Sequence, residues 1–260
     1  MAGDRTLIQI RERSFLDLLD LALVVVRRRP WTIGLAALAG VAPCAALNAY
    51  LTSDPEFNPY LFIVLLVVEA PWATAPLTVV LGSLMFGERP TPLGVVKALA
   101  RGLPSMVLHQ LILRGLIGSF IILFPIIPSR LAFMDEVILL ERGKMFGVAR
   151  RTSTLCGARG GEFFGQWVAQ MAFGFLFVAC FWFGTGALVS ALVTSEVTWE
   201  RPGAGSLYST RFQLAVWLAV SFFGVARFLT YIDQRIRLEG WELKLRLQAV
   251  GRSMEEASRW

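Results

Sequence analysis

The sequence LFIVLLVV, at Leu61–Val68, decides the fold class, because eight uncharged apolar residues stand in a row there. They belong to a longer apolar stretch, Tyr60–Phe86, that also contains Glu69, Pro71 and Pro76. On the membrane-insertion scale the eight residues contribute roughly 2.4–4.8 kcal/mol, which offsets a cost of about 2.5–3.5 kcal/mol for a central Glu69. The stretch therefore predicts a transmembrane helix.

Five further apolar stretches follow the same pattern. Trp31–Tyr50 is uncharged and has about the twenty residues that a helix needs to cross a bilayer. The others are Ser105–Phe124, Ser129–Leu140, Phe163–Val193 and Phe212–Tyr231. Because Ser129–Leu140 would span only about 18 Å as a helix, we leave open whether it is a tilted span, a span that extends past Glu141, or a re-entrant segment packed inside the protein.

The composition agrees with lipid as the solvent. Hydrophobic residues make up 55% of the 260 residues and charged residues only 17%, against about 25% charged in typical soluble domains. This balance excludes a disordered chain, a coiled coil and a disulfide-rich secreted module. The three cysteines, Cys44, Cys156 and Cys180, are too far apart in sequence to predict a metal cluster.

The positive charges predict the orientation of the spans. Of the 25 Lys and Arg residues, twenty fall on one side of a six-span arrangement and three on the other. Cytoplasmic segments carry the excess of Lys and Arg in membrane proteins. We therefore predict a multi-pass protein of a bacterial cytoplasmic (inner) membrane with both termini in the cytoplasm, which requires an even number of crossings.

The fold class that follows is all-α, a polytopic transmembrane helix bundle with amphipathic interfacial helices. Six spans fit the pattern, and four fit if the third and fourth stretches form one re-entrant hairpin. The chain then divides into an interfacial N-terminal helix at residues 1–30, a transmembrane bundle at 31–231 and a basic amphipathic tail at 232–260.

The cytoplasmic segments are predicted to meet the membrane surface. Ser14 and Asp17 predict a capped amphipathic helix that ends at the basic RRRP sequence. The tail has two apolar stripes on a helical wheel, although WELKLRL also suits a short strand. The basic charge predicts binding to anionic lipid headgroups or to a protein partner, and not to nucleic acid. The residues expected to bind them are Arg27, Arg28, Arg29, Arg150, Arg151, Arg235, Arg237, Trp241, Lys244 and Arg246.

Several short sequences occur here in a known order. A GERPTPLG turn follows the second span, EVILLERG precedes a basic helix with ARRTS at Ala149–Ser153, and IRLEGWELKLRL lies at residues 236–247 near the end of the sequence. The layout resembles the membrane-domain family named for glycerophosphoryl diester phosphodiesterases, and related six-span bacterial membrane proteins. Two positions depart from that pattern: Thr154 stands where many relatives have Trp, and Ile126 follows Pro125 in place of Gly. The resemblance implies an integral membrane fold but assigns no catalytic residue, because the phosphodiesterase activity of that family belongs to a separate soluble domain.

Ionisable residues at membrane depth are the candidates for a functional site, because such groups usually face a partner or a cavity. They are Glu69, His109, Arg114, Arg130, Asp135, Glu136 and Arg227. We single out Glu69, His109 and Arg114 as substrate or ion-pair candidates. Glu69 stands beside two helix prolines, as in transporter sites, whereas a structural Glu69–Arg114 pair is the simpler alternative. Asp135 and Glu136 are assigned to the cytoplasmic interface, and Arg227 to snorkelling.

The functional hypotheses follow from these residues. One histidine and no phosphate-binding loop leave little for catalysis, so we predict a non-enzymatic membrane scaffold or complex component that needs no cofactor and no metal. A small permease or lipid-handling transporter with a Glu69/Arg114 site is the alternative. A membrane-embedded enzyme that uses His109 is the third hypothesis.

Overall fold

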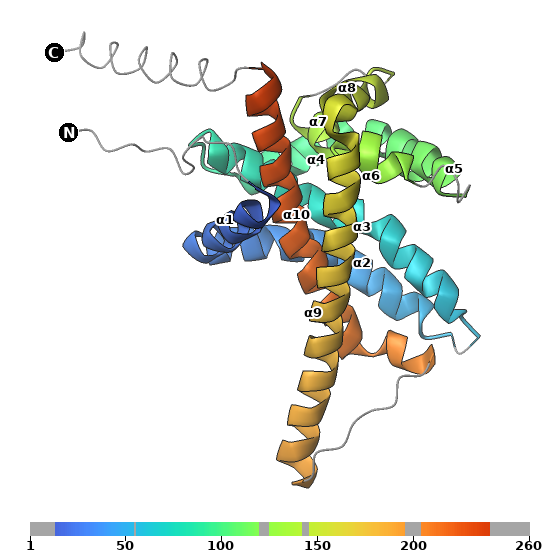
Figure 1. Cartoon of the computed structure of the whole chain (residues 1–260). Helices are drawn as coiled ribbons and strands as arrows, with labels where there is room; N and C mark the ends of the chain where they lie inside the picture. Colours follow the sequence, from blue (N-terminus) through green and yellow to red (C-terminus); the bar gives the residue numbers. More distant parts are fainter. Residues whose placement is uncertain (1–13, 55, 120–124, 142–145, 196–203, 240–260) are drawn as a thin grey trace, which may run out of the picture.

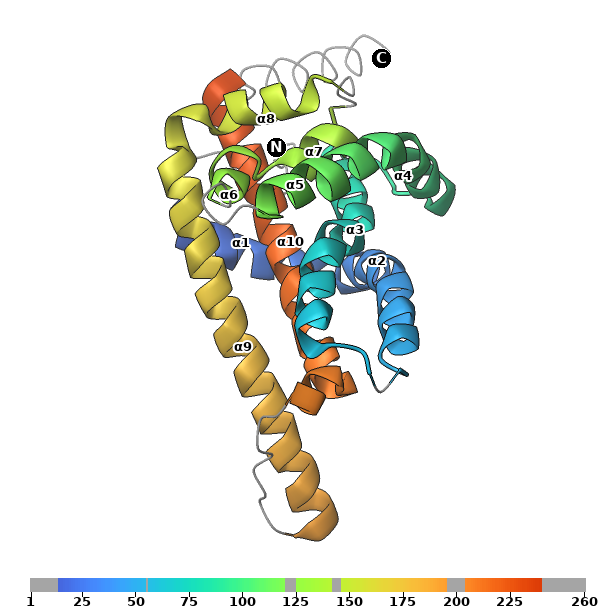
Figure 2. The same cartoon turned by 90° about the vertical axis from the view of Figure 1, so that its right-hand side faces the viewer.

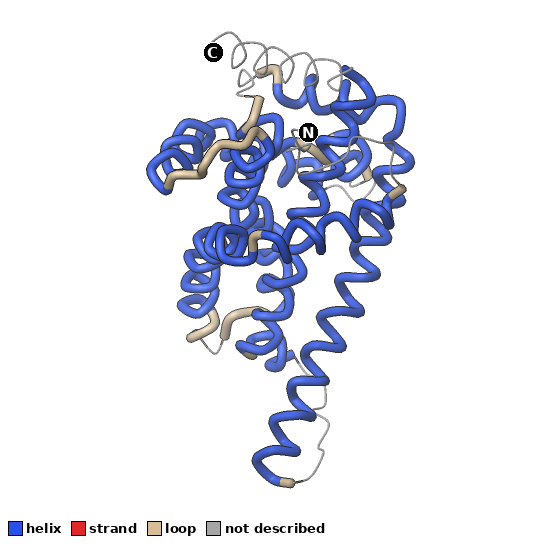
Figure 3. Tube along the Cα trace, turned by 90° about the vertical axis from the view of Figure 1, so that its left-hand side faces the viewer, coloured by secondary structure: helices blue, strands red, loops and turns tan. Residues whose placement is uncertain are grey.

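The computed structural model describes residues 14–54, 56–119, 125–141, 146–195 and 204–239. Within these ranges the chain is helical with short turns and contains no strand (Figure 3). This confirms the predicted all-α class. Four of the described helices are long and apolar enough to cross a membrane, which indicates a membrane protein.

The N-terminal helix α1, Phe15–Arg28, is an amphipathic helix as predicted. Its Ser14 cap accepts a hydrogen bond from the Asp17 N–H at 3.3 Å, and the Asp17 carboxylate accepts one from the Ser14 N–H at 3.0 Å. Leu18 and Ala22 are buried on one face, whereas Leu23 is exposed on the other. The helix therefore packs on the bundle and still presents apolar groups outward.

Two long helices form an antiparallel pair (Figure 1). Helix α2, Pro30–Leu51, begins with the proline that stops α1, and helix α3, Pro59–Met85, begins after an Asn58 side-chain cap. The two backbones approach closely at Gly40, where an added Cβ would lie 2.0 Å from the Ala73 carbonyl oxygen. Only glycine fits at this crossing.

The other two long helices are α9, Gly160–Thr194, and α10, Thr210–Glu239, which pack against each other. Only Phe163 and Trp182 of α9 are buried, and large apolar side chains such as Phe175 and Leu192 are exposed. An exposed apolar surface of this extent is typical of contact with lipid. The four long helices lie at the predicted first, second, fifth and sixth spans.

The third and fourth predicted spans have a different form. The chain from Pro92 to Leu139 is divided into short helices: α4, Pro92–Met106; the π-helical η1, Val107–Leu113; α5, Arg114–Ser119; α6, Ile126–Arg130; and α7, Met134–Leu139. These helices, with α8, Val148–Cys156, gather at one end of the long helices (Figure 2). We call the segment 92–156 the cap. Neither Ser105–Phe124 nor Ser129–Leu140 is among the candidate spans of the described chain.

One buried core joins the cap to the long helices. It contains Leu77 and Leu81 of α3, Val137 of α7, Leu155 of α8 and Phe228 of α10. The apolar residues of the fourth predicted span therefore pack against protein side chains. The short connections η3, Gly157–Arg159, and η4, Ala204–Tyr208, lead into α9 and α10.

Candidate functional site

The strongest polar cluster of the described chain centres on Arg227 of α10. Its Nη2 lies 2.7 Å from Asp135 Oδ2, and its Nε donates to Glu136 Oε1 at 2.9 Å. Nη2 also donates to the Thr74 hydroxyl of α3 at 3.3 Å. Asp135 and Glu136 are buried in α7. We call these four residues the Arg227 clamp, which ties the cap to two long helices.

The clamp continues into the π-helical turn of the cap. The Gln110 amide of η1 donates to Asp135 Oδ1. Arg114, the first residue of α5, donates through Nη1 to Gln110 Oε1 at 3.0 Å. Arg114 also interacts electrostatically with Asp135 and Glu136, so two guanidinium groups balance two carboxylates. Helical turns of the π type occur frequently at functional sites.

The charged groups of the clamp are paired with one another, so they hold the helices in place and leave few groups available for catalysis or ligand binding. Three of the four carboxylate oxygens of Asp135 and Glu136 have a hydrogen-bond or ion-pair partner, and only Glu136 Oε2 is buried without one. A buried ion pair adds little net stability by itself, because both charges lose hydration. Removing one partner is costly, because the other charge stays buried and unpaired.

A second cluster surrounds Glu141, two residues beyond the end of α7. Arg151 of α8 donates through Nε to Glu141 Oε2 at 2.7 Å, and the Tyr231 hydroxyl donates to Oε1 at 2.8 Å. Arg235 of α10 lies 3.5 Å from the same Oε1. The cluster therefore joins α8 to the last turns of α10.

A third contact holds α10 to the start of α9. Gln234 donates to the Leu155 carbonyl oxygen at 2.8 Å and accepts from Arg159 Nη1 at 3.1 Å. Arg159 also pairs with Glu162 and lies over the ring of Phe163. The end of α10 is thus part of the packed structure, so residues 232–239, assigned from the sequence to the tail, belong to the bundle.

The structure places the three predicted site residues apart from one another. Glu69 of α3 accepts a hydrogen bond from the Asn48 amide at 2.9 Å. The His109 ring Nδ1 lies 2.8 Å from the Ser105 carbonyl oxygen, one turn earlier in the chain. Arg114 bonds to Gln110. A Glu69–Arg114 pair is therefore not formed, because Arg114 belongs to the cap and faces α7, whereas Glu69 faces α2.

The predicted surface residues also divide into groups. Arg27, Arg28, Arg29 and Arg150 are exposed. Arg151 and Arg235 bond to Glu141, and Arg237 pairs with Asp233 at 2.7 Å within α10. Trp241, Lys244 and Arg246 lie outside the described residues. Binding of headgroups or a partner by these residues stays a prediction.

The three charged residues of the Arg227 clamp were identified from the sequence, but their pairing was not. Asp135 and Glu136 were assigned to the interface and Arg227 to snorkelling, whereas all three meet inside the protein. The available signal was two adjacent acidic residues in an apolar stretch together with one arginine in another. Gln110 and Thr74 carried no such signal, because single uncharged polar residues are common in membrane helices.

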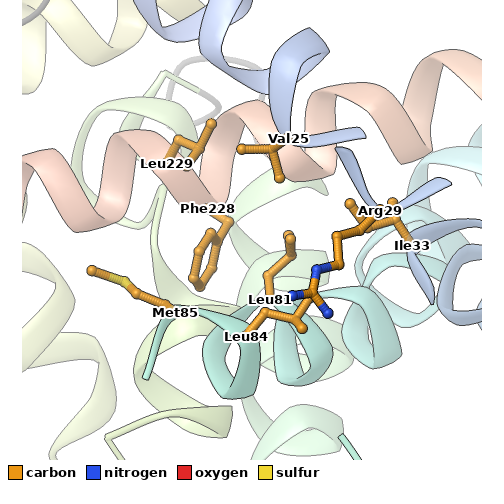
Figure 4. A pocket seen from close by; sticks show the side chains of 8 residues that line it. All are labelled: Val25, Arg29, Ile33, Leu81, Leu84, Met85, Phe228 and Leu229. Atoms are coloured by element: carbon orange, nitrogen blue, oxygen red, sulfur yellow. The ribbon is translucent and has the colours of Figure 1, made fainter. Parts of the chain in front are cut away.

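The structure also shows a small cavity between α1, α2, α3 and α10 (Figure 4). Its volume is about 20 Å³, enough for about one water molecule. The lining includes Val25, Ile33, Leu81 and Phe228, with Arg29 at its side. An apolar space of this size does not suit a substrate.

The three cysteines do not form disulfide bonds with one another. Cys44 and Cys156 are buried and Cys180 is exposed, and all three are free thiols. Burial raises the pKa of the Cys156 thiol in the cap to about 11. This thiol is therefore protonated and unreactive at neutral pH.

Comparison of the chain with protein-family models, with curated proteins and with solved structures gives no match.

Proposed function

We propose that this protein is a non-enzymatic integral membrane scaffold with four crossings, and that both termini and the cap lie on the cytoplasmic side of a bacterial inner membrane. Four helices of suitable length and hydropathy support this number of crossings. A cap on the cytoplasmic side also improves the charge asymmetry, because Arg130 then joins the basic side. Only Arg201 and Arg211 remain between α9 and α10 on the other side.

The position of Arg130 supports a hairpin that returns to the side from which it came. In a six-span protein, Arg130 and the start of α9 lie on opposite faces of the membrane. In the structure Arg130 Nη1 donates to the Gly157 carbonyl oxygen at 3.2 Å, and an added Cβ on Gly160 would lie 3.0 Å from the Ser129 carbonyl oxygen. Since one bilayer core is about 30 Å thick, these contacts favour the four-span alternative.

The observation that carries the scaffold proposal is the mutual pairing of the polar groups between the cap and the spans. The Arg227 clamp and the Glu141 cluster bind α7 and α8 to α3 and α10. Such pairing gives the cap one fixed orientation on its membrane anchor, which suits a platform for other proteins. The exposed basic residues Arg27, Arg28 and Arg150 are then held at the headgroup level.

The scaffold proposal predicts partners that depend on the tail. We expect the full chain, purified from its own membranes in mild detergent, to retain partner proteins at a constant ratio. A chain that ends at Glu239 is expected to lose them and to keep its unfolding midpoint, because Gln234 and Arg235 still make their contacts. Quantitative mass spectrometry of both preparations measures the ratio.

A matched variant separates charge from length in this experiment. Replacing Lys244 and Arg246 with glutamine retains the tail and removes two cations. Loss of the same partners shows that the basic tail recruits them. Recovery of the full chain alone, at the same purity as the truncated chain, contradicts the scaffold proposal.

A permease is the second candidate, and one observation favours it. Glu69 Oε1 and Asn48 Oδ1 are buried in the long helices without a hydrogen-bond partner, which is unusual unless a ligand or proton is bound. Arg114, the other predicted site residue, is engaged in the cap. This candidate predicts solute or lipid flux in proteoliposomes that Glu69→Gln abolishes, and unchanged flux in that variant rejects it.

Membership of the glycerophosphoryl diester phosphodiesterase membrane-domain family is also a proposal. It is supported by the order of the amphipathic helix, the first two spans, the proline turn and the basic helix along the chain. Such membership agrees with the proposal of a non-enzymatic membrane protein, because the phosphodiesterase activity of that family belongs to a separate soluble domain.

A further inference from the structure

Asn48 and Glu69 form an isolated polar pair between α2 and α3. Both side chains are buried, with Asn48 fully inaccessible and Glu69 6% exposed. The Asn48 amide donates to Glu69 Oε2 at 2.9 Å. The two helices approach closely at Gly40 and Ala73, and the pair lies between the same two helices, about one turn from Ala73 and about two turns from Gly40.

The hydrogen bonding of this pair is incomplete if Glu69 is ionised. Glu69 Oε1 and Asn48 Oδ1 are both buried and have no hydrogen-bond partner. Both are acceptors, so a single missing donor accounts for both. An ionised Glu69 also places a negative charge in the span without a counter-ion, because none of the described Arg or Lys residues pairs with it. An unpaired charge at this position is costly.

The groups around the pair do not supply the missing donor. The small core beside it contains Cys44 of α2, Phe62 and Leu66 of α3 and Trp217 of α10. Cys44 is the ionisable neighbour on α2. The indole Nε1 of Trp217 is itself buried without an acceptor, so it does not donate to Glu69. From η4, the Tyr208 hydroxyl donates to the Phe57 carbonyl oxygen.

We propose that Glu69 is a proton-binding site, and that it holds a proton on Oε1 which it donates to Asn48 Oδ1. A carboxylic acid and a primary amide are complementary, because each offers one donor and one acceptor. The pair then makes two hydrogen bonds, one in each direction, and carries no charge. Binding takes one proton from water to one carboxylate oxygen, and no other bond changes.

A metal ion fits the two open oxygens less well than a proton does. Hard cations such as calcium and magnesium take six or more oxygen ligands, often with water. Glu69 and Asn48 offer two open oxygens in a small core that is otherwise apolar. A proton needs one donor oxygen and one acceptor oxygen, which matches this number.

The proton couples the α2–α3 contact to pH. In the protonated form the pair joins the two helices by two hydrogen bonds, and loss of the proton removes one of them and leaves a charge. Glutamine at position 69 reproduces the protonated form, since its amide donates to Asn48 Oδ1 and its oxygen accepts from the Asn48 amide. This inference is independent of the scaffold proposal, because it concerns residues outside the cap and tail.

Infrared spectroscopy of the full chain in lipid vesicles tests the proposal. We expect the difference between spectra at neutral and alkaline pH to contain the carbonyl band of a protonated carboxylic acid. The band should be absent in Glu69→Gln and shifted in Asn48→Leu, in which the acid loses its amide partner. As a matched control, Glu162→Gln should leave this band unchanged, because Glu162 pairs with Arg159 and is ionised.

The outcomes decide between the two protonation states. A band that Glu69→Gln removes supports the proposal. If the spectra at neutral pH have the same protonated-carboxyl band in the wild-type chain and in Glu69→Gln, then Glu69 is ionised at that pH, which overturns the proposal. A Glu69 signal that changes when sodium ions are replaced by choline at constant pH shows that a metal cation occupies the site, which also overturns it.

Discussion

Arg227→Met is expected to destabilise the protein by about 3–5 kcal/mol, because it leaves Asp135 and Glu136 buried and without their guanidinium partner. Methionine is of similar length, so the loss concerns charge more than volume. The denaturant-induced unfolding midpoint of the purified protein in detergent measures the effect. Detachment of the cap is expected to accompany unfolding, since α7 loses its bond to α10.

Two further variants make this result specific. Arg150→Met removes a cation from an exposed position of α8 and should change the midpoint little. Combining Arg227→Met with Glu136→Gln removes the carboxylate left without a counter-charge, keeps Asp135 to balance Arg114, and should recover most of the stability. A small effect of Arg227→Met, comparable to that of Arg150→Met, shows that the clamp does not hold the cap.

Gly40→Ala is expected to destabilise the α2–α3 pair by about 3 kcal/mol, at the upper end of the usual cost of overpacking. The new Cβ would lie 2.0 Å from the Ala73 carbonyl oxygen and 2.8 Å from the Ala73 carbonyl carbon. Both are backbone atoms, which cannot rotate away as a side chain can. The helices must separate, and the Asn48–Glu69 hydrogen bond is lost with them.

Gly34 provides a matched control on the same helix. An added Cβ at Gly34 has no neighbour within 4 Å, and alanine has a higher helix propensity than glycine by up to about 1 kcal/mol. Gly34→Ala should therefore leave stability unchanged or raise it. Equal unfolding midpoints for the two alanine variants contradict the close crossing at Gly40.

The long helices were predictable because their signals are local. Trp31–Tyr50 and Tyr60–Phe86 agree with α2 and α3 to within a residue or two at each end. Prolines and capping residues at Pro30, Asn58 and Pro59 mark where these helices begin. Length and apolar composition are sufficient for such helices, whatever their partners.

The cap was less predictable because composition does not tell lipid contact from protein contact. Ile127, Val137 and Ile138 are buried against other parts of the chain, whereas an apolar run of the same kind in α9 is exposed. The run at Ser105–Phe124 also passes through a π-helical turn, η1, which no residue pattern in it indicated. Only the tertiary contacts of α7 and α8 distinguish the cap from a pair of spans.

Several charged residues of the candidate sites were predictable from the sequence, whereas their uncharged partners and their pairing were not. Glu69 was identified correctly as a buried carboxyl group, but its partner is Asn48, 21 positions away and uncharged. Arg227 meets Glu136 across 91 positions. Pairing over such distances depends on which helix faces adjoin, and sequence spacing alone contains no information about this.

The side of the membrane on which Arg130 lies tests the central claim most directly. Single cysteines at Arg130, Asp54 and Arg150, on a chain without its three native cysteines, can be labelled from either side with an impermeant thiol reagent. With four spans and a cytoplasmic cap, Arg130→Cys is labelled from the cytoplasmic side together with Arg150→Cys, and Asp54→Cys from the opposite side. Labelling of Arg130→Cys together with Asp54→Cys contradicts the account and restores six spans.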